Sequence, residues 1–183
     1  MEQEQEQGRG QVSGQEHDRQ PGRSRERAVR VRAARPDEAA ALTDLALRSK
    51  AHWGYDAAFM AACADELTLR PSDVARRRTV VAEAADGRLV GLATLEGPPP
   101  EGELGLMFVD PDAMGHGVGR LLFDHVRDTA RALGFAHVRW AADPNAVPFY
   151  EAVGGRHVGA VPSGSVPGRT LPLMEITTAA PRP

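Results

Sequence analysis

Three closely spaced glycines in the middle of the chain could bind a pyrophosphate group. They follow a short apolar segment, residues 107–109, that suits a buried strand and ends at Asp110-Pro111. Gly115, Gly117 and Gly119 carry no side chain that would keep an anion away from the backbone. The amides left free at the start of the following helix, together with the positive end of its dipole, would then face the ligand.

The spacing of the glycines excludes two common phosphate-binding motifs. A P-loop ends in Gly-Lys-Ser/Thr, whereas Arg120 and Leu121 follow Gly119 here. The dinucleotide fingerprint Gly-x-Gly-x-x-Gly fails in both registers, because Arg120 or Leu122 stands at the third glycine. The pattern that remains is x-x-x-Gly-x-Gly over residues 114–119.

This pattern resembles the pyrophosphate loop of the GNAT superfamily of acetyl-CoA-dependent N-acetyltransferases, Gln/Arg-x-x-Gly-x-Gly/Ala. Gly117 and Gly119 match that loop, and Met114 replaces its usual Gln or Arg. A second segment, Asp-Pro-Asn-Ala-Val-Pro-Phe-Tyr-Glu-Ala-Val-Gly-Gly-Arg at residues 143–156, resembles a later motif of the same family. There we expect Asn145 to cap a short helix and Gly154 to end it. The resemblance covers about residues 29–177.

The resemblance implies that acetyl-CoA is the co-substrate, bound by the loop, by the strand before it and by the later motif. Within this set, the family suggests that the amide of Met107 stabilises the oxyanion and that the amide of Val109 contacts the pantetheine. The implied cofactor-binding residues are Met107, Phe108, Val109, Met114, Gly115, His116, Gly117, Val118, Gly119, Arg120, Asn145, Phe149 and Tyr150.

Acetylation of an amine requires a base for the amine, a donor for the oxyanion and an acid for the leaving thiolate. Glu103 is the candidate base. It lies eleven residues before Met114, the separation found in the histone-acetyltransferase branch, and strand periodicity puts it on one face with Met107 and Val109. The alternative for Glu103 is a solvated strand end. The resemblance makes Tyr150 the acid; its alternative is a core aromatic residue with a hydrogen-bonded hydroxyl.

The acceptor site is expected at the connection between the first two helices, where the resemblance implies it. Residues 49–56 read Ser-Lys-Ala-His-Trp-Gly-Tyr-Asp. Trp53 and Tyr55 could enclose an acceptor, while Lys50 and His52 could orient an anionic group or relay a proton. Alternatively, the two aromatic side chains hold the two helices together.

The elements that must position these residues read as one α/β domain over residues 28–178. The resemblance implies a GNAT-like, mixed and mostly antiparallel central sheet with helices on both faces. Arg169, between the last two strands, either enters the acceptor site or lies on the surface. Besides the two motifs, we expect strands at 29–33, 79–83, 89–95, 136–141, 156–161 and 170–177, and helices at 36–49, 56–67 and 117–133.

Composition narrows the class of protein further. The net charge of −3 gives no electrostatic case for nucleic acid, and no apolar run reaches the length of a membrane span. A single cysteine, Cys63, excludes an internal disulfide and a cysteine-cluster zinc site, and we expect it to be buried filler. Residues 1–27 are polar and lack the apolar segment of a secretion signal, so we expect a disordered tail and a cytoplasmic protein. A short C-terminal tail is expected at 179–183.

Two classes of function remain open. The first is an N-acetyltransferase acting on a primary amine of a small molecule or a peptide. The second is a non-catalytic acyl-CoA-binding or regulatory domain of the same fold. Glu103 and Tyr150 favour the enzyme, because a binding module has no need for an acid and a base beside the thioester. No metal is expected, and the resemblance also allows a homodimer.

Overall fold

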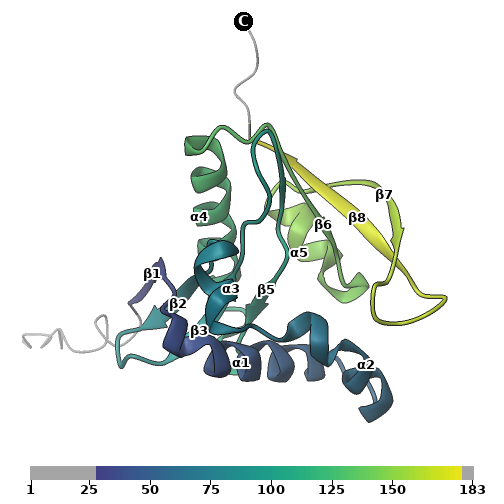
Figure 1. The fold of residues 1–183 in the computed structure, drawn as a ribbon, viewed down its shortest axis with the longest axis horizontal. Coiled ribbons are helices and arrows are strands. Elements are labelled where there is room, and N and C mark those ends of the chain that lie inside the picture. The colour runs from purple at the N-terminus through teal and green to yellow at the C-terminus, as the bar shows by residue number, and fades with distance from the viewer. Residues whose placement is uncertain (1–27, 179–183) are drawn as a thin grey trace, which may run out of the picture.

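The computed structural model describes residues 28–178, and the two expected tails, 1–27 and 179–183, lie outside that range. Within the described range, the chain forms two four-stranded sheets and five α-helices (Figure 1). The strands are β1 (Val29–Ala33), β2 (Val80–Ala84), β3 (Leu89–Ala93), β4 (Glu101–Glu103), β5 (Met107–Val109), β6 (His137–Ala141), β7 (Arg156–Pro162) and β8 (Thr170–Thr177). The helices are α1 (Ala39–Ala51), α2 (Ala57–Leu67), α3 (Pro71–Arg76), α4 (Val118–Ala132) and α5 (Val147–Ala152).

The first sheet has the order β1-β2-β3-β5, and all its strands are antiparallel. The expected hairpin between β2 and β3 is confirmed. Its turn contains Gly87 at φ +85°, a conformation that glycine adopts without strain, and the Asp86 side chain accepts from the Arg88 amide. The two faces of this sheet are covered by different helices, because Val81 and Leu92 pack with α1 residues whereas Ala82 and Val90 pack with α4 residues.

The second sheet has the order β4-β6-β8-β7, in which only the β4–β6 pair is parallel. It packs against α4 and α5 through Phe123, Trp140 and Tyr150, whose rings lie 4.9–6.1 Å apart. The expected fold class, mixed and mostly antiparallel strands with helices on both faces, is therefore confirmed. The difference is that the strands divide into two sheets.

A β-bulge produces this division. Thr94 and Leu106 are paired through backbone and side-chain hydrogen bonds, and the next backbone pair is Glu96 with Glu103. Between these two pairs, one segment advances by two residues, from 94 to 96, and the other by three, from 106 to 103. The extra residue is a β-bulge, and it bends the bulged segment away from its partner. Strand periodicity was expected to place Glu103 on one face with Met107 and Val109, and this expectation is wrong: the segment breaks at 104–106, β4 joins β6, and β5 joins β3.

Three local features refine the sequence prediction. The short helix α3 was not anticipated, although Pro71 opens it and the Asp73 side chain accepts from the Arg70 amide, both of which favour a helix start. The expected cap at Asn145 is wrong: Asp143 caps the turn and accepts from the Asn145 amide at 3.0 Å. Gly154, at φ +96°, follows α5 as expected.

Three further observations concern the class of protein. Cys63 is buried in the cluster beneath α1 and α2, with its sulfur 3.3 Å from the Ser165 hydroxyl, which confirms its packing role. Within residues 28–178, no helix combines the length and the apolar character needed to cross a bilayer. No group of three or more metal-ligating side chains comes together in the same part of the chain.

Candidate active site

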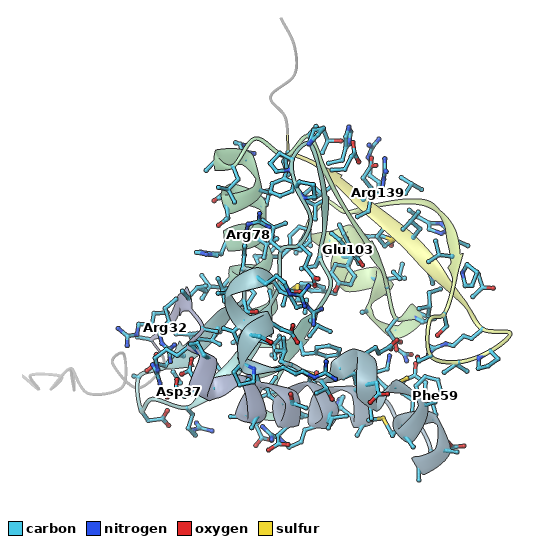
Figure 2. All side chains as sticks on the ribbon, in the orientation of Figure 1. Arg32, Asp37, Phe59, Arg78, Glu103 and Arg139 are labelled. Atoms are coloured by element: carbon cyan, nitrogen blue, oxygen red, sulfur yellow. The ribbon has the colours of Figure 1, made fainter. Side chains whose placement is uncertain are left out.

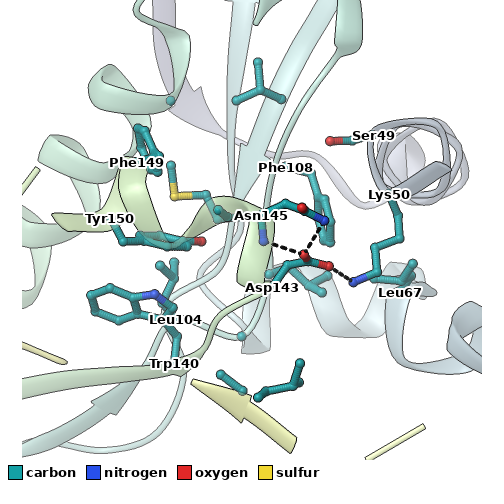
Figure 3. A pocket seen from close by; sticks show the side chains of 18 of the residues that line it. Ser49, Lys50, Leu67, Leu104, Phe108, Trp140, Asp143, Asn145, Phe149 and Tyr150 are labelled. Atoms are coloured by element: carbon teal, nitrogen blue, oxygen red, sulfur yellow. Dashed lines mark hydrogen bonds and ion pairs between the residues drawn. The ribbon is translucent and has the colours of Figure 1, made fainter. Parts of the chain in front are cut away.

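A cavity of about 700 Å³ opens where β5 and β6 separate. β5 is the last strand of the first sheet, and β6 loses its β4 neighbour beyond Arg139, so each presents an unpaired edge there. Side chains from the two halves of the fold meet across this gap (Figure 3). Of the residues expected at the site, the cavity is lined by Lys50, Trp53, Glu103, Met107, Phe108, Val109, Met114, Gly115, Gly117, Gly119, Arg120, Asn145, Phe149 and Tyr150. His52, Tyr55, His116 and Val118 lie outside the lining.

The glycine turn presents free backbone donors at one end of the cavity. Among the described residues, none of the amides from Gly115 to Arg120 donates a hydrogen bond, and the first helical bond of α4 runs from Leu121 to Gly117. Gly115 and Gly117 have φ of +76° and +84°, and nothing lies within 4 Å of a Cβ at either position. Successive unpaired amides at a helix start fit a pyrophosphate, so the turn fits the phosphates of coenzyme A.

Gly119 lines the cavity and also meets a packing requirement. A Cβ at this position would lie 3.1 Å from the ring of Phe149. The residue therefore lets α4 approach α5 closely, whereas Gly115 and Gly117 leave open space beside the backbone. The glycine pattern thus serves both ligand access and helix packing.

The backbone of β5 directs two amides toward the cavity. Leu106 and Asp110 donate their amides toward β3, to Thr94 and Val90 respectively. Because amide directions alternate along a strand, the amides of Met107 and Val109 point to the unpaired edge. These are the two amides expected to contact the oxyanion and the pantetheine.

Glu103 reaches the same cavity from β4, near the middle of the molecule (Figure 2). Its side chain is exposed and makes no hydrogen bond or ion pair within residues 28–178. The neighbouring carboxylate of Glu96 differs, because it accepts from Arg77 at 2.6 and 2.7 Å and from Thr94 at 2.9 Å. Glu96 and Glu103 pair through their backbones, and of the two carboxylates the one on Glu103 is available to accept a proton.

Tyr150 lies in the opposite part of the lining, on α5. Its ring packs against Phe123, Trp140 and Phe149, and the residue is only 8% exposed. The hydroxyl takes part in none of the hydrogen bonds found within residues 28–178, and Figure 3 shows it directed toward the side where Asn145 lies. Burial, and then the charge of Asp143, raise the pKa of Tyr150, so the hydroxyl stays neutral and can donate.

The connection between α1 and α2, where the acceptor site was expected, contacts Asp143. The sequence predicted no role for this residue. The Asp143 carboxylate accepts from Lys50 Nζ at 2.7 Å and from the Tyr55 hydroxyl at 2.8 Å. Asn145 Nδ2 also donates to it at 3.1 Å, and Arg169 lies 3.6 Å away while donating to the Tyr55 hydroxyl at 3.0 Å. We call these five residues the Asp143 cluster.

Burial alone would raise the pKa of Asp143, but hydrogen bonds from Lys50, the Asn145 amide and Tyr55 outweigh it and hold the pKa below its usual range. Tyr55 also stacks on Phe59, with ring centroids 4.0 Å apart. For Tyr55, these contacts support the alternative in which the side chain holds neighbouring segments together. Trp53 lines the cavity and is 42% exposed. His52 is also exposed, and within residues 28–178 the aromatic ring that it contacts is that of Trp53, edge to face.

Sequence comparison decides the family. The acetyltransferase (GNAT) family profile matches residues 41–154, which include the glycine turn, both unpaired strand edges and α5. The chain belongs to the GNAT acetyltransferase family. It is accordingly an acetyltransferase with acetyl-CoA as co-substrate, and the free amides from Gly115 to Arg120 fit that ligand. No curated protein matches the chain at a significant level.

Solved structures share the GNAT fold at low identity. The PaiA N-acetyltransferase from Thermoplasma acidophilum, in complex with coenzyme A, is 16% identical with a TM-score of 0.69, over 82% of this chain and 99% of that one. A GCN5-related N-acetyltransferase from Rhodopseudomonas palustris is 24% identical with a TM-score of 0.67, over 81% and 94%. The protein yncA from Salmonella typhimurium, solved with its cofactor acetyl-CoA, is 21% identical with a TM-score of 0.60, over 85% of this chain and 98% of that one.

Proposed function

We propose that this GNAT acetyltransferase transfers the acetyl group of acetyl-CoA to a primary amine of a small molecule or a peptide. One observation carries the proposal: an unpaired carboxylate, Glu103, and an unpaired phenol, Tyr150, line the same cavity as the free amides of the glycine turn. An acyl-CoA-binding domain would need the turn alone. The N-acetyltransferases among the structural neighbours support an amine as the acceptor.

The proposed reaction is a direct attack on the thioester. Glu103, directly or through a water molecule, takes a proton from the ammonium form of the acceptor. The amine nitrogen then bonds to the carbonyl carbon, whose oxygen becomes an oxyanion held by the amide of Met107. When the carbon–sulfur bond breaks, the departing thiolate takes the Tyr150 proton. The nitrogen then loses its second proton, which restores the Tyr150 phenol, and Glu103 releases the first proton to solvent. The products are an acetamide and free coenzyme A, and no covalent enzyme intermediate is formed.

The electrostatics of the cavity support this division of roles. Burial raises the pKa of Tyr150, so its hydroxyl stays protonated at neutral pH and can donate a hydrogen bond to the sulfur as negative charge develops there. Glu103 is exposed and has no cation bound to it within the described residues. An incoming ammonium group therefore does not compete with a salt bridge for this carboxylate.

The experiment is a screen of primary amines and peptide amino termini for acetyl-CoA-dependent thiol release, with the acetylated product confirmed by mass. The wild-type protein should acetylate at least one class of amine. The variants Glu103→Gln and Tyr150→Phe should turn over the same amine more slowly while binding acetyl-CoA normally. Normal acetyl-CoA binding with no product from any amine would instead favour the non-catalytic acyl-CoA-binding function.

A further inference from the structure

Two aspartates stand at equivalent places in the two sheets. Asp110 follows β5 and Asp143 follows β6, and each begins an Asp-Pro-x-Ala sequence that forms one turn of 3-10 helix. Each carboxylate accepts from the amide two residues later, at 3.1 Å for Asp110 and 3.0 Å for Asp143. Each is therefore the cap of its own turn.

The last turn of α1 carries two basic side chains, and each donates to one of the two capping aspartates. Arg48 donates to Asp110 at 3.0 Å, and Lys50 donates to Asp143 at 2.7 Å. Because β5 and β6 belong to different sheets and separate at the cavity, α1 joins the turns that follow the two separated strands. In Figure 3, Lys50 extends from this helix toward Asp143 at the cavity.

The two ion pairs differ in their surroundings. The Arg48 side chain is 55% exposed, and neither Arg48 nor Asp110 lines the cavity. The side chains of Lys50 and Asp143 are 11% and 13% exposed, and both line it. An exposed pair contributes little, whereas loss of one partner from a buried pair leaves the other charge uncompensated.

Asp143 also binds segments that Asp110 does not reach. Tyr55 comes from the α1–α2 connection and Arg169 from the β7–β8 connection, and both converge on the Asp143 carboxylate. The guanidinium of Arg169 lies over the stacked rings of Phe59 and Tyr55, 4.7 and 5.3 Å from their centroids. Without the charge of Asp143, Lys50 and Arg169 would be two neighbouring cations with no shared anion.

We propose that Asp143 is a positioning residue for the acceptor amine. It holds residues 49–56 and 163–169, which flank the cavity, against the turn that precedes the Tyr150 helix. The acceptor is thereby bound in a fixed place relative to the thioester. The inference rests on the proposed function for the acceptor itself, whereas the holding of the two segments depends only on the contacts described above.

The test compares Asp143→Asn with Asp110→Asn, which changes the same atom in a matching cap. We expect Asp143→Asn to raise the KM for the acceptor about tenfold, because displacement of residues 49–56 and 163–169 misplaces the amine. The affinity for acetyl-CoA should stay within about twofold of the wild-type value. Asp110→Asn should leave the acceptor KM unchanged. An acceptor KM at the wild-type value in folded Asp143→Asn, or an equal rise in both variants, would overturn the proposal.

Hydrogen exchange supplies a readout that needs no turnover. In Asp143→Asn, peptides covering residues 49–56 and 163–169 should exchange faster, whereas Asp110→Asn should leave them at the wild-type rate. If no amine is acetylated by the wild-type protein, the proposed function fails, and faster exchange in these two peptides still supports their attachment to Asp143. Unchanged exchange in both peptides overturns the proposal whatever the activity.

A second variant covers the case in which Asp143→Asn does not fold. Tyr55→Phe keeps the ring on Phe59 and removes only the hydroxyl that bonds Asp143 and Arg169. It should raise the acceptor KM in the same direction, by a smaller factor, with acetyl-CoA affinity unchanged. An acceptor KM and an exchange pattern identical to those of the wild type would contradict the inference.

Discussion

The ring of Phe149 lies 3.1 Å from the place that a Cβ atom on Gly119 would occupy. The helix that begins at the glycine turn therefore packs directly on the helix that carries Tyr150. The helix that carries the proposed general acid thus depends on a contact made in the first turn of α4, and a change at Gly119 acts on that contact.

The first prediction concerns this contact. Gly119→Ala forces Phe149 aside, and an overpacked contact of this kind costs about 1–3 kcal/mol of unfolding free energy. Because Phe149 and Tyr150 are adjacent, kcat should fall along with stability. Thermal unfolding and steady-state kinetics measure both effects. Restoration of both by the compensating change Phe149→Leu is expected, and wild-type behaviour of Gly119→Ala alone would show that the contact is unimportant.

The second prediction separates ligand access from backbone strain. Gly117 and Gly134 stand at the two ends of α4, with φ of +84° and +82°, and neither has an atom within 4 Å of a Cβ. Alanine should therefore cost the same strain, about 1–2 kcal/mol, at both positions. Only Gly117→Ala should weaken acetyl-CoA binding, about tenfold, because its methyl group faces the phosphate. Calorimetric titration checks this, and equal affinities of the two variants would contradict it.

The third prediction uses the tyrosine content of the chain, which has two tyrosines, Tyr55 and Tyr150. In Tyr55→Phe, the tyrosinate absorbance during alkaline titration reports Tyr150 alone. Burial and then Asp143 raise its pKa above the ordinary 10.0, so ionisation should begin at a higher pH. A midpoint at the ordinary value in the folded protein would contradict the buried placement.

The same shift predicts how stability depends on pH. A raised pKa means that the folded state favours the neutral phenol. The contribution of Tyr150 to stability is therefore complete below the unfolded value of about 10 and is lost as the pH rises through the folded pKa. Tyr150→Phe should lack this part of the alkaline loss, which denaturant unfolding at a series of alkaline pH values would measure.

The fourth prediction concerns the base. If Glu103 takes the amine proton, Glu103→Gln should lower the rate most at pH values where the amine is protonated, and high pH should partly restore it. Glu101→Gln is the matched control, because Glu101 lies on the same strand and pairs with Arg139 outside the cavity. A loss in Glu103→Gln that is independent of pH would assign the residue to substrate positioning.

Local signals in the sequence predicted much of the fold. The β2–β3 hairpin follows from Asp86-Gly87, and the turn before α4 follows from its closely spaced glycines, of which Gly115 and Gly117 have positive φ. The bulge between Glu96 and Leu106 could not be predicted in this way, because it depends on how β3 pairs with a distant segment. The expectation that Glu103 shares a strand face with Met107 and Val109 failed for that reason.

The Asp143 cluster was the least predictable part of the candidate site, because its contacts join distant residues. Lys50 and Asp143 are 93 positions apart, and Tyr55 and Arg169 are 114 apart. Periodicity and turn propensity say nothing about such pairs. One signal was present: the sequence Asp-Pro-x-Ala occurs at both Asp110 and Asp143, after two strands that separate at the cavity.

The most direct test of the account is a parallel measurement of kcat and acetyl-CoA affinity in Tyr150→Phe. The variant keeps the ring that packs on Trp140 and Phe123 and removes the hydroxyl that we propose protonates the thiolate. The account predicts a kcat about 10²-fold lower with acetyl-CoA affinity unchanged, the usual scale for a lost general acid. Wild-type kcat in a folded Tyr150→Phe variant would contradict it and leave Tyr150 as a core aromatic residue.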